Sequence, residues 1–219
     1  MRFIELLSTY GDMYVEAAFA TWWMTAVSFI GAMILGLMVT VMRVCPIKPL
    51  RVVGDFYVQV FRNIPGISML ILVAYALPYL GLVLDWVPCV LVSAILICSA
   101  FASENFMSGI NTVGVGQIEA ARSLGLTFTQ MMRLVIIPQA LRSVVPPMTN
   151  LLIATMLTTA IASQVPVTPP ELTGVVSYIN TRMPYGVLAF IVPAATYLCT
   201  SLLIGYVGNK IDQRVRILR

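Results

Sequence analysis

Charged side chains are too scarce in this chain for a soluble fold, and this scarcity limits the fold more than any other feature. Only 10% of its 219 residues are charged and 59% are hydrophobic, whereas a soluble domain carries about 25% charged residues. A helix needs about 20 mostly apolar residues to cross the hydrocarbon core of a bilayer. The long apolar stretches of this sequence therefore predict an all-α integral membrane protein.

Five apolar stretches are separated by proline, glycine and charged residues. We expect the membrane crossings at residues 19–42, 67–84, 89–102, 148–163 and 185–207. Pro78 and Gly81 predict a kink or an early end in the second crossing. The polar residues 103–147 separate the third crossing from the fourth, and a proline-rich stretch at residues 165–174 follows the fourth.

Lys and Arg residues divide unequally between the two sides of a five-span topology. With the N-terminus outside, eleven of the 13 fall on the inner side, and only Arg2 and Arg182 lie outside. Because cytoplasmic loops carry the excess of positive charge, we predict an outer N-terminus and a cytoplasmic C-terminus. Residues 1–18 are then an extracytoplasmic segment, residues 19–210 the transmembrane domain and residues 211–219 a cytoplasmic tail.

The residue types that usually carry out catalysis or hold metals are few. The chain has no histidine, which removes the commonest general base and metal ligand. Its four cysteines are scattered without a C-x-x-C pair, at Cys45, Cys89, Cys98 and Cys199. No G-x-x-x-x-G-K-[ST] phosphate-binding loop is present. We therefore expect no catalytic residue, no metal site and no nucleotide hydrolysis in this chain.

The polar segment between the third and fourth crossings predicts two short helices joined by a glycine turn. Residues 116–124 are rich in helix formers. Gly125 stands where a helix ends in a positive φ, which glycine adopts without a steric clash. Thr127 and Gln130 have the spacing of a capping box at the start of a second helix, and Pro138 is expected to end or kink that helix.

This segment resembles the EAA loop of ATP-binding-cassette (ABC) importer permeases, which is written E-A-A-x-x-x-G-x9-I-x-L-P. Five residues match it, namely Glu119, Ala120, Ala121, Gly125 and Pro138. Val135 and Ile137 are conservative replacements at the Ile and Leu positions. The resemblance implies that about residues 114–138 form the coupling loop, in which Arg122 and the five matching residues dock in a groove of a cytoplasmic ATPase.

Other runs resemble the polar amino acid subfamily of these importers, whose permeases have five spans and an outer N-terminus. The runs are F-R-N-I-P at 61–65, A-S-E-N-F at 102–106, I-P-Q-A-L-R at 137–142, P-P-M-T-N at 146–150 and E-L-T at 171–173. The resemblance covers about residues 20–210. It implies a type I ABC importer permease in the bacterial plasma membrane, which takes up polar amino acids or close analogues by alternating access.

The resemblance also implies partners. Two ATPase subunits would hold ATP and Mg²⁺, so this chain would carry no cofactor. A second permease would complete the pathway, and an extracytoplasmic binding protein would deliver the substrate. The chain would contact lipid and no nucleic acid. One departure concerns the fourth helix, where Ala154 and Thr155 replace the family's usual Lys and acid or Asn. Because a different second permease can retain that pair, we favour a heteromeric permease pair.

Polar side chains in or beside the crossings are the candidates for a substrate pathway, since such groups are costly in lipid and tend to be functional. They are Glu104, Asn150, Thr155, Thr158 and Gln164. Each also has a structural explanation. For Glu104 we prefer an ion pair with an arginine such as Arg62, and for Asn150 a helix start or a contact between helices. Threonine hydroxyls also hydrogen-bond helices together in lipid.

Three alternatives follow from the same sequence. The same architecture can serve another small solute, such as an opine, a dipeptide or a sulfur amino acid. A stand-alone ion-coupled transporter would carry several intramembrane charges and an internal repeat, and the sequence displays neither. A membrane enzyme is disfavoured by the missing histidine and by the lack of clustered acids.

Overall fold

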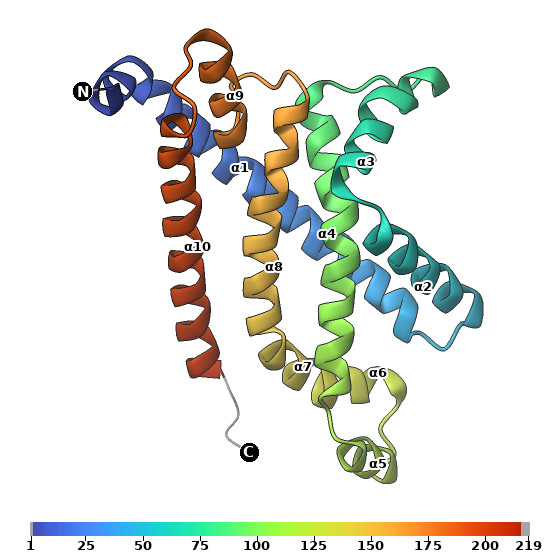
Figure 1. Ribbon diagram of the computed structural model, residues 1–219. Helices are drawn as coiled ribbons and strands as arrows, with labels where there is room; N and C mark the ends of the chain where they lie inside the picture. Colours follow the sequence, from blue (N-terminus) through green and yellow to red (C-terminus); the bar gives the residue numbers. More distant parts are fainter. Residues whose placement is uncertain (1, 216–219) are drawn as a thin grey trace.

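The computed structural model describes residues 2–215, and every regular element in that range is helical. Four helices are long and apolar enough to cross a membrane. They are α1 (Arg2–Val44), α4 (Trp86–Asn111), α8 (Val145–Thr158) with its 3₁₀ continuation η4 (Thr159–Gln164), and α10 (Leu188–Val215). Helix α8 lies between α4 and α10, and α1 crosses these helices obliquely (Figure 1).

The second predicted crossing is a pair of helical runs joined at a bend of 105°. The first run is α2 (Lys48–Asn63), and the second consists of α3 (Gly66–Ile71), the π turn η1 (Leu72–Ala76) and the 3₁₀ turn η2 (Leu77–Leu80). Pro65 disfavours the helical conformation for the residue before it, and Ile64 is accordingly extended, with φ −88° and ψ 126°. Gly81, with φ +81°, ends the second run early, as predicted.

With this bent pair counted as one crossing, the described residues hold five candidate crossings by length and composition, which is the expected number, although the second begins at Lys48 and not at residue 67. Helix α4 runs past its predicted end at residue 102 as far as Asn111. Helix α10 likewise extends beyond residue 207 to Val215. The side of the membrane on which each end lies stays a prediction. Of the predicted tail, residues 216–219 lie outside the described residues.

Helix α1 begins at Arg2, so the described part of the predicted outer segment and the first crossing form one continuous helix. Its 43 residues measure about 65 Å at about 1.5 Å per residue, roughly twice the hydrocarbon thickness. The helix must therefore tilt strongly or extend beyond the membrane. The acidic residues that interrupt the apolar pattern, Glu5, Asp12 and Glu16, are all exposed.

An additional helix, α9 (Leu172–Arg182), follows the proline-rich loop and was not expected from the sequence. It packs against the first half of α1, where Leu6 and Ile179 belong to one buried cluster. The Tyr14 hydroxyl of α1 donates to the Ala189 carbonyl of α10 over 2.9 Å. These contacts hold α1, α9 and α10 together at the end of the bundle that contains the N-terminus (Figure 1).

Small residues let α1 and α4 approach closely. A Cβ atom added at Gly36 would lie 2.6 Å from the Ala102 Cβ and 2.8 Å from the Ser99 carbonyl oxygen. One turn along α1, the Thr40 and Ser103 hydroxyls are 3.1 Å apart and hydrogen-bonded. Because lipid is as apolar as a leucine side chain, close packing and hydrogen bonds of this kind hold membrane helices together.

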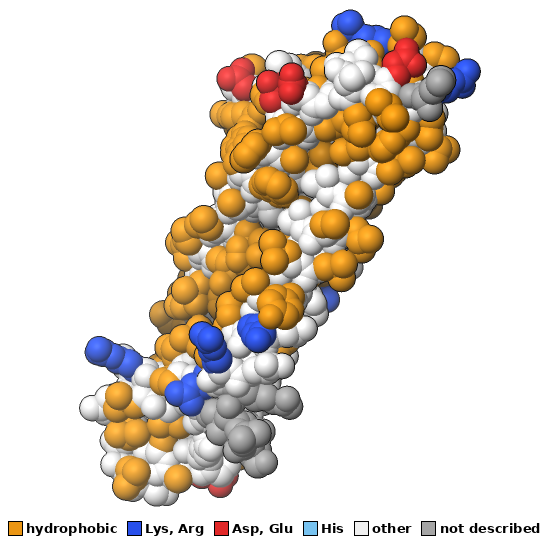
Figure 2. All heavy atoms as spheres, turned by 90° about the vertical axis from the view of Figure 1, so that its left-hand side faces the viewer, with side chains coloured by type: hydrophobic (Ala, Val, Ile, Leu, Met, Phe, Trp, Pro, Cys, Tyr) orange, Lys and Arg blue, Asp and Glu red, His pale blue; other side chains and the backbone are white. Residues whose placement is uncertain are grey.

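The surface has the polarity of a membrane protein. In Figure 2, hydrophobic side chains cover the middle of the molecule, Asp and Glu gather at the upper end with some Lys or Arg, and Lys and Arg predominate near the lower end. On α10, only 11% of the most apolar window is buried. This helix therefore presents most of its surface to lipid or to another subunit.

We predict that Gly36→Val lowers the stability of the protein in detergent, because the backbone oxygen of Ser99 cannot move aside as a side chain would. Overpacking typically costs about 1–3 kcal/mol. The matched control is Gly205→Val on α10, where an added Cβ meets nothing within 4 Å. Thermal melting of the purified variants measures the effect, and equal melting temperatures for the two would contradict the prediction.

Candidate functional site

The predicted coupling loop is a compact set of short helices beyond the ends of α4 and α8 (Figure 1). They are α5 (Val115–Ser123), α6 (Phe128–Met131), the π turn η3 (Met132–Ile136) and α7 (Ile137–Ser143). Four buried side chains form their common core, namely Val113, Ala121, Met131 and Ile136. The segment thus has a hydrophobic core of its own, separate from the clusters within the bundle.

The turn between α5 and α6 has the predicted conformation. Gly125 has φ +74°. Its N–H donates to the Arg122 carbonyl over 2.9 Å, and the Leu126 N–H donates to the Ala121 carbonyl over 3.2 Å. These two bonds are the Schellman motif, which satisfies carbonyls that a helix end leaves free. The exit angle from α5 is therefore fixed by hydrogen bonds as well as by glycine.

The capping box at the start of α6 is also present. The Gln130 N–H donates to the Thr127 Oγ1 over 3.3 Å, and the Thr127 N–H donates to the Gln130 Oε1 over 2.9 Å. Pro138 does not end the helix that follows. The chain stays helical from Phe128 to Ser143, and the disturbance takes the form of the π turn directly before Ile137 and Pro138. A wider turn accommodates the ring, which would otherwise clash with the carbonyl four residues earlier.

The residues predicted to dock on an ATPase do not all face outward. Glu119, Ala120, Arg122, Gly125 and Pro138 are exposed, whereas Ala121 is only 4% exposed and packs in the core of the segment.

Two large apolar side chains beside the glycine turn were not singled out from the sequence. Leu124 is 80% exposed and Phe128 is 48% exposed.

The pathway candidates on α8 and η4 differ in burial. Asn150 and Ala154 are exposed and Thr158 is partly buried, and their spacing of four residues places them on one face. Thr155 is fully buried, and as the residue three before Thr158 it is adjacent to Thr158 on the helix surface. Both threonine hydroxyls donate to the carbonyl four residues earlier over 2.8 Å. Gln164 is exposed at the end of η4. The structure therefore brings together Thr155 and Thr158, which both contact Cys98 of α4, whereas Asn150 lies about two helical turns from Thr158.

Glu104 belongs to an ion-pair cluster that joins three helices. Its Oε1 lies 2.9 Å from the Arg43 Nη2, and its Oε2 lies 3.5 Å from the Arg62 Nη1. The Arg43 Nε also pairs with the Asp55 Oδ1 at 2.8 Å, and its Nη1 donates to the Ser103 Oγ over 3.2 Å. The pair with Arg62 is the one preferred from the sequence, but the closer partner is Arg43, which the sequence did not indicate.

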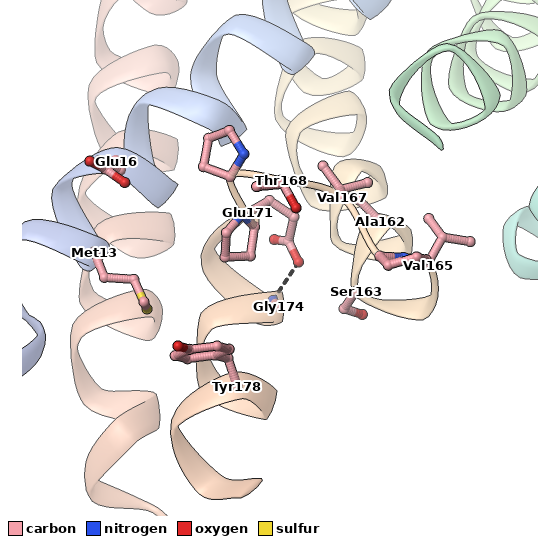
Figure 3. A pocket seen from close by; sticks show the side chains of 13 residues that line it. Met13, Glu16, Ala162, Ser163, Val165, Val167, Thr168, Glu171, Gly174 and Tyr178 are labelled. Atoms are coloured by element: carbon pink, nitrogen blue, oxygen red, sulfur yellow. Dashed lines mark hydrogen bonds between the residues drawn. The ribbon is translucent and has the colours of Figure 1, made fainter. Parts of the chain in front are cut away.

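A pocket of about 490 Å³ opens at the other end of the bundle, between α1, η4, the proline-rich loop and α9 (Figure 3). Glu16 lines it from α1, and Glu171 lies where the loop meets α9. Glu171 is only 1% exposed. It caps α9 by accepting from the Thr173 and Gly174 N–H groups, both over 2.7 Å, and it accepts from the Tyr197 hydroxyl over 3.0 Å.

Burial raises the pKa of Glu171 above its ordinary value, and the hydrogen bonds from Thr173, Gly174 and Tyr197 oppose that rise. Sequence reasoning gave this acid no role. The signal that could have identified it is a carboxylate directly before a short amphipathic run, the position of a helix N-cap.

Comparison with known proteins decides the family. The family described as "Binding-protein-dependent transport system inner membrane component" matches residues 32–217. The chain belongs to this family. As an ABC importer permease, it is a multi-pass protein of the bacterial plasma membrane, and ATP is hydrolysed by a separate subunit of the importer.

Individual ABC importer permeases resemble the chain over most of its length. The glutamate transport system permease protein GluC of Corynebacterium efficiens is 40% identical over 165 residues, covering 70% of this chain and 72% of that protein. The L-cystine transport system permease protein TcyB of Bacillus subtilis is 33% identical over 193 residues, covering 88% and 82%. A crystal structure of an amino acid ABC transporter with histidines has a TM-score of 0.89 at 27% identity, covering 95% and 96%.

We predict that the ion-pair cluster stabilises the permease, and that Glu104→Leu lowers its melting temperature. The variant leaves the Arg43 guanidinium, whose side chain is only 12% exposed, without its Glu104 partner. A lost partner of this kind costs about 1–3 kcal/mol. In Glu104→Leu, the Arg43 guanidinium keeps only Asp55 as an acidic partner. The double variant Arg43→Met/Glu104→Leu removes this buried guanidinium, and the Asp55 side chain that then loses its partner is 60% exposed. It should be more stable than Glu104→Leu alone, and a lower melting temperature for the double variant would refute the interpretation.

We also predict that Glu171→Ala destabilises the permease, because α9 loses its N-cap, which is worth about 1 kcal/mol. Glu16→Ala is the control, since this acid lines the same pocket but is exposed. Thermal melting at neutral pH separates the two variants. Equal melting temperatures would mean that the cap contributes nothing.

The raised pKa of Glu171 adds a pH dependence with a defined sign. The folded state binds this proton more readily than the unfolded state, so stability falls as pH rises from the unfolded pKa to the folded pKa. Relative to wild type, Glu171→Gln should therefore lose stability as the pH is lowered through that window. A difference in melting temperature that does not change with pH would count against the assignment.

Proposed function

We propose that this permease forms part of the pathway by which an ABC importer takes up a polar amino acid or a close analogue. The observation that carries the proposal is the coupling segment, in which the turn at Gly125 presents exposed side chains beyond the ends of α4 and α8. The substrate class is supported by the names of the relatives, which include permeases for glutamate and for L-cystine.

The proposed mechanism is alternating access driven by two ATPase subunits, which hold the ATP and Mg²⁺. ATP binding brings the ATPases together, and the coupling segments docked on them move with them. Of the exposed residues, Glu119 lies in the middle of the nine-residue helix α5, so its carboxylate is presented from the side of the coupling helix. Leu124 and Phe128 add apolar contact area to the same docking surface.

A second permease subunit completes the pathway in this proposal. Asn150 and Thr158 lie on a face of α8 that this chain does not bury completely, so a partner is needed to enclose that face. Ala154 lies between them and is exposed. The absence of a charged pair at residues 154 and 155 supports a different permease as partner, because that permease would supply the pair. In the same proposal, a binding protein delivers the substrate from outside.

A sulfur amino acid is a second candidate substrate. The relative named for L-cystine transport supports it, with coverage of 88% of this chain. Uptake of radiolabelled glutamate, glutamine, arginine and cystine by cells that express the whole importer distinguishes the two. If cystine is the only unlabelled amino acid that competes for uptake, the substrate is a sulfur amino acid.

We predict that Gly125→Arg abolishes uptake while the variant still inserts into the membrane. An added Cβ at Gly125 meets nothing within 4 Å, so the fold tolerates the side chain at a strain of about 1–3 kcal/mol for the positive φ. The arginine nevertheless adds bulk and charge to the docking surface. Gly125→Asn is the matched control, because asparagine tolerates the left-handed conformation.

The measurement is a detergent pull-down from native membranes together with uptake. Gly125→Arg should lose the ATPase that copurifies with wild type, and Gly125→Asn should retain it. Wild-type uptake by Gly125→Arg would refute the coupling role. A second, different permease among the copurified chains supports the heteromeric pair, whereas copies of this chain alone would rule it out.

A further inference from the structure

The coupling helix α5 is joined to the rest of the protein by few contacts. Ala121 inserts into the core of the segment. On the same helix, Gln117 accepts a hydrogen bond from Gln139 of α7. Among residues 2–215, it is the only side-chain hydrogen bond found between α5 and another helix. Gln117 is exposed and Gln139 is partly buried.

Gln139 uses both hydrogens of its side-chain amide. The Nε2 atom donates to the Gln117 Oε1 over 2.5 Å and to the Val135 carbonyl oxygen over 3.1 Å. An amide nitrogen has two hydrogens, so the two bonds together fix the position of the group. One bond leads to the coupling helix, and the other leads to the π turn η3, directly before Pro138.

Helix α7 is held firmly to the spanning helices. An added Cβ at Gly109 of α4 would lie 3.0 Å from the Ala140 carbonyl oxygen and 2.3 Å from the Val144 Cγ1, so the two backbones are in close contact. Helix α7 ends at Ser143, and α8 begins at Val145. A displacement of Gln139 therefore displaces α7, which is packed on α4. The displacement reaches α8 through Val144, the one residue between α7 and α8.

We propose that Gln117 and Gln139 form a hydrogen-bonded strut that transmits the movement of the coupling helix to α7 and α8. The pair touches neither substrate nor nucleotide and acts as a positioning pair. It sets how much of the ATPase movement reaches the pathway. This inference rests on the proposed function, because it takes the ATPase to dock on α5.

The competing explanation is that apolar packing in the core of the coupling segment, and not this hydrogen bond, transmits the movement of α5 to α7. Leucine substitutions separate the two, since leucine is close to glutamine in size but cannot form the bond. Gln139→Leu, Gln117→Leu and the double variant are compared in the complete importer, reconstituted in proteoliposomes with its ATPase, partner permease and binding protein. Gln59→Leu is the control, because Gln59 is exposed on α2, outside the coupling segment.

The readout is the number of ATP molecules hydrolysed per substrate molecule transported, with retention of the ATPase measured in parallel. Each single variant should raise this ratio by about three- to tenfold, the change that corresponds to one hydrogen bond. The double variant should equal Gln139→Leu, because the bond to Gln117 is already lost once Gln139 is replaced. Gln139→Glu should recover part of the coupling, since the Gln117 amide can rotate and donate to the carboxylate. In every variant the ATPase should copurify as in wild type.

An unchanged ratio in Gln117→Leu overturns the proposal even if Gln139→Leu fails to fold, because Gln117 is exposed and its replacement does not disturb a core. Additive effects in the double variant overturn it as well, since they mean that the two residues act separately. A wild-type preparation without any ATPase is a different result and refutes the proposed function itself.

Discussion

The hydrocarbon core contains no water, and this constraint governs the rest of the structure. A backbone N–H or C=O group without a partner there costs several kcal/mol, so crossings must be helical and irregular backbone must be covered by protein. The break between α2 and α3 follows this rule. Pro65 has no N–H to leave unpaired, and Ile64 packs against the main buried cluster. About two helical turns earlier along α2, the Tyr57 hydroxyl donates to the Leu96 carbonyl of α4 over 3.2 Å, which attaches the bent pair to the bundle.

The same constraint explains why the helices meet through small residues. Apolar side chains gain nothing by leaving lipid for one another, so association depends on close approach and hydrogen bonds. Gly36 provides that approach between α1 and α4, and Gly208 provides it between α10 and α8, where an added Cβ would lie 2.3 Å from the Thr149 Oγ1. Most of the apolar window of α10 is open, as is the face of α8 with Asn150 and Ala154. A single chain with two open faces does not enclose a pathway, which is the geometric argument for the proposed second permease.

The sequence was sufficient for features that depend on local chemistry or on long apolar runs. The crossings, the left-handed Gly125 and the capping box at Thr127 are of this kind. It was insufficient where tertiary contacts decide. The apolar residues of α9 have helical spacing, but a segment of 11 residues is marginal as an isolated helix, so packing on α1 and the Glu171 cap decide its structure. The first half of α1 was missed because its exposed acids suppress the hydropathy signal. Arg43 looked like an ordinary loop cation, since only the fold shows that Asp55 and Glu104 both reach it.

The coupling segment shows how very short helices become rigid. The 4 residues of α6 would not stay helical alone, because helix nucleation is unfavourable. The capping box fixes its start, and Met131 ties it to the buried core that it shares with Ala121 of α5. Leu124 and Phe128 can therefore remain exposed on opposite sides of the turn without the segment rearranging to cover them. Their separation is then set by the Gly125 backbone and the two Schellman hydrogen bonds. In the proposed docking, a groove that accepts both side chains would have to match that fixed spacing, and the glycine would then determine the docking geometry although it has no side chain with which to make a contact.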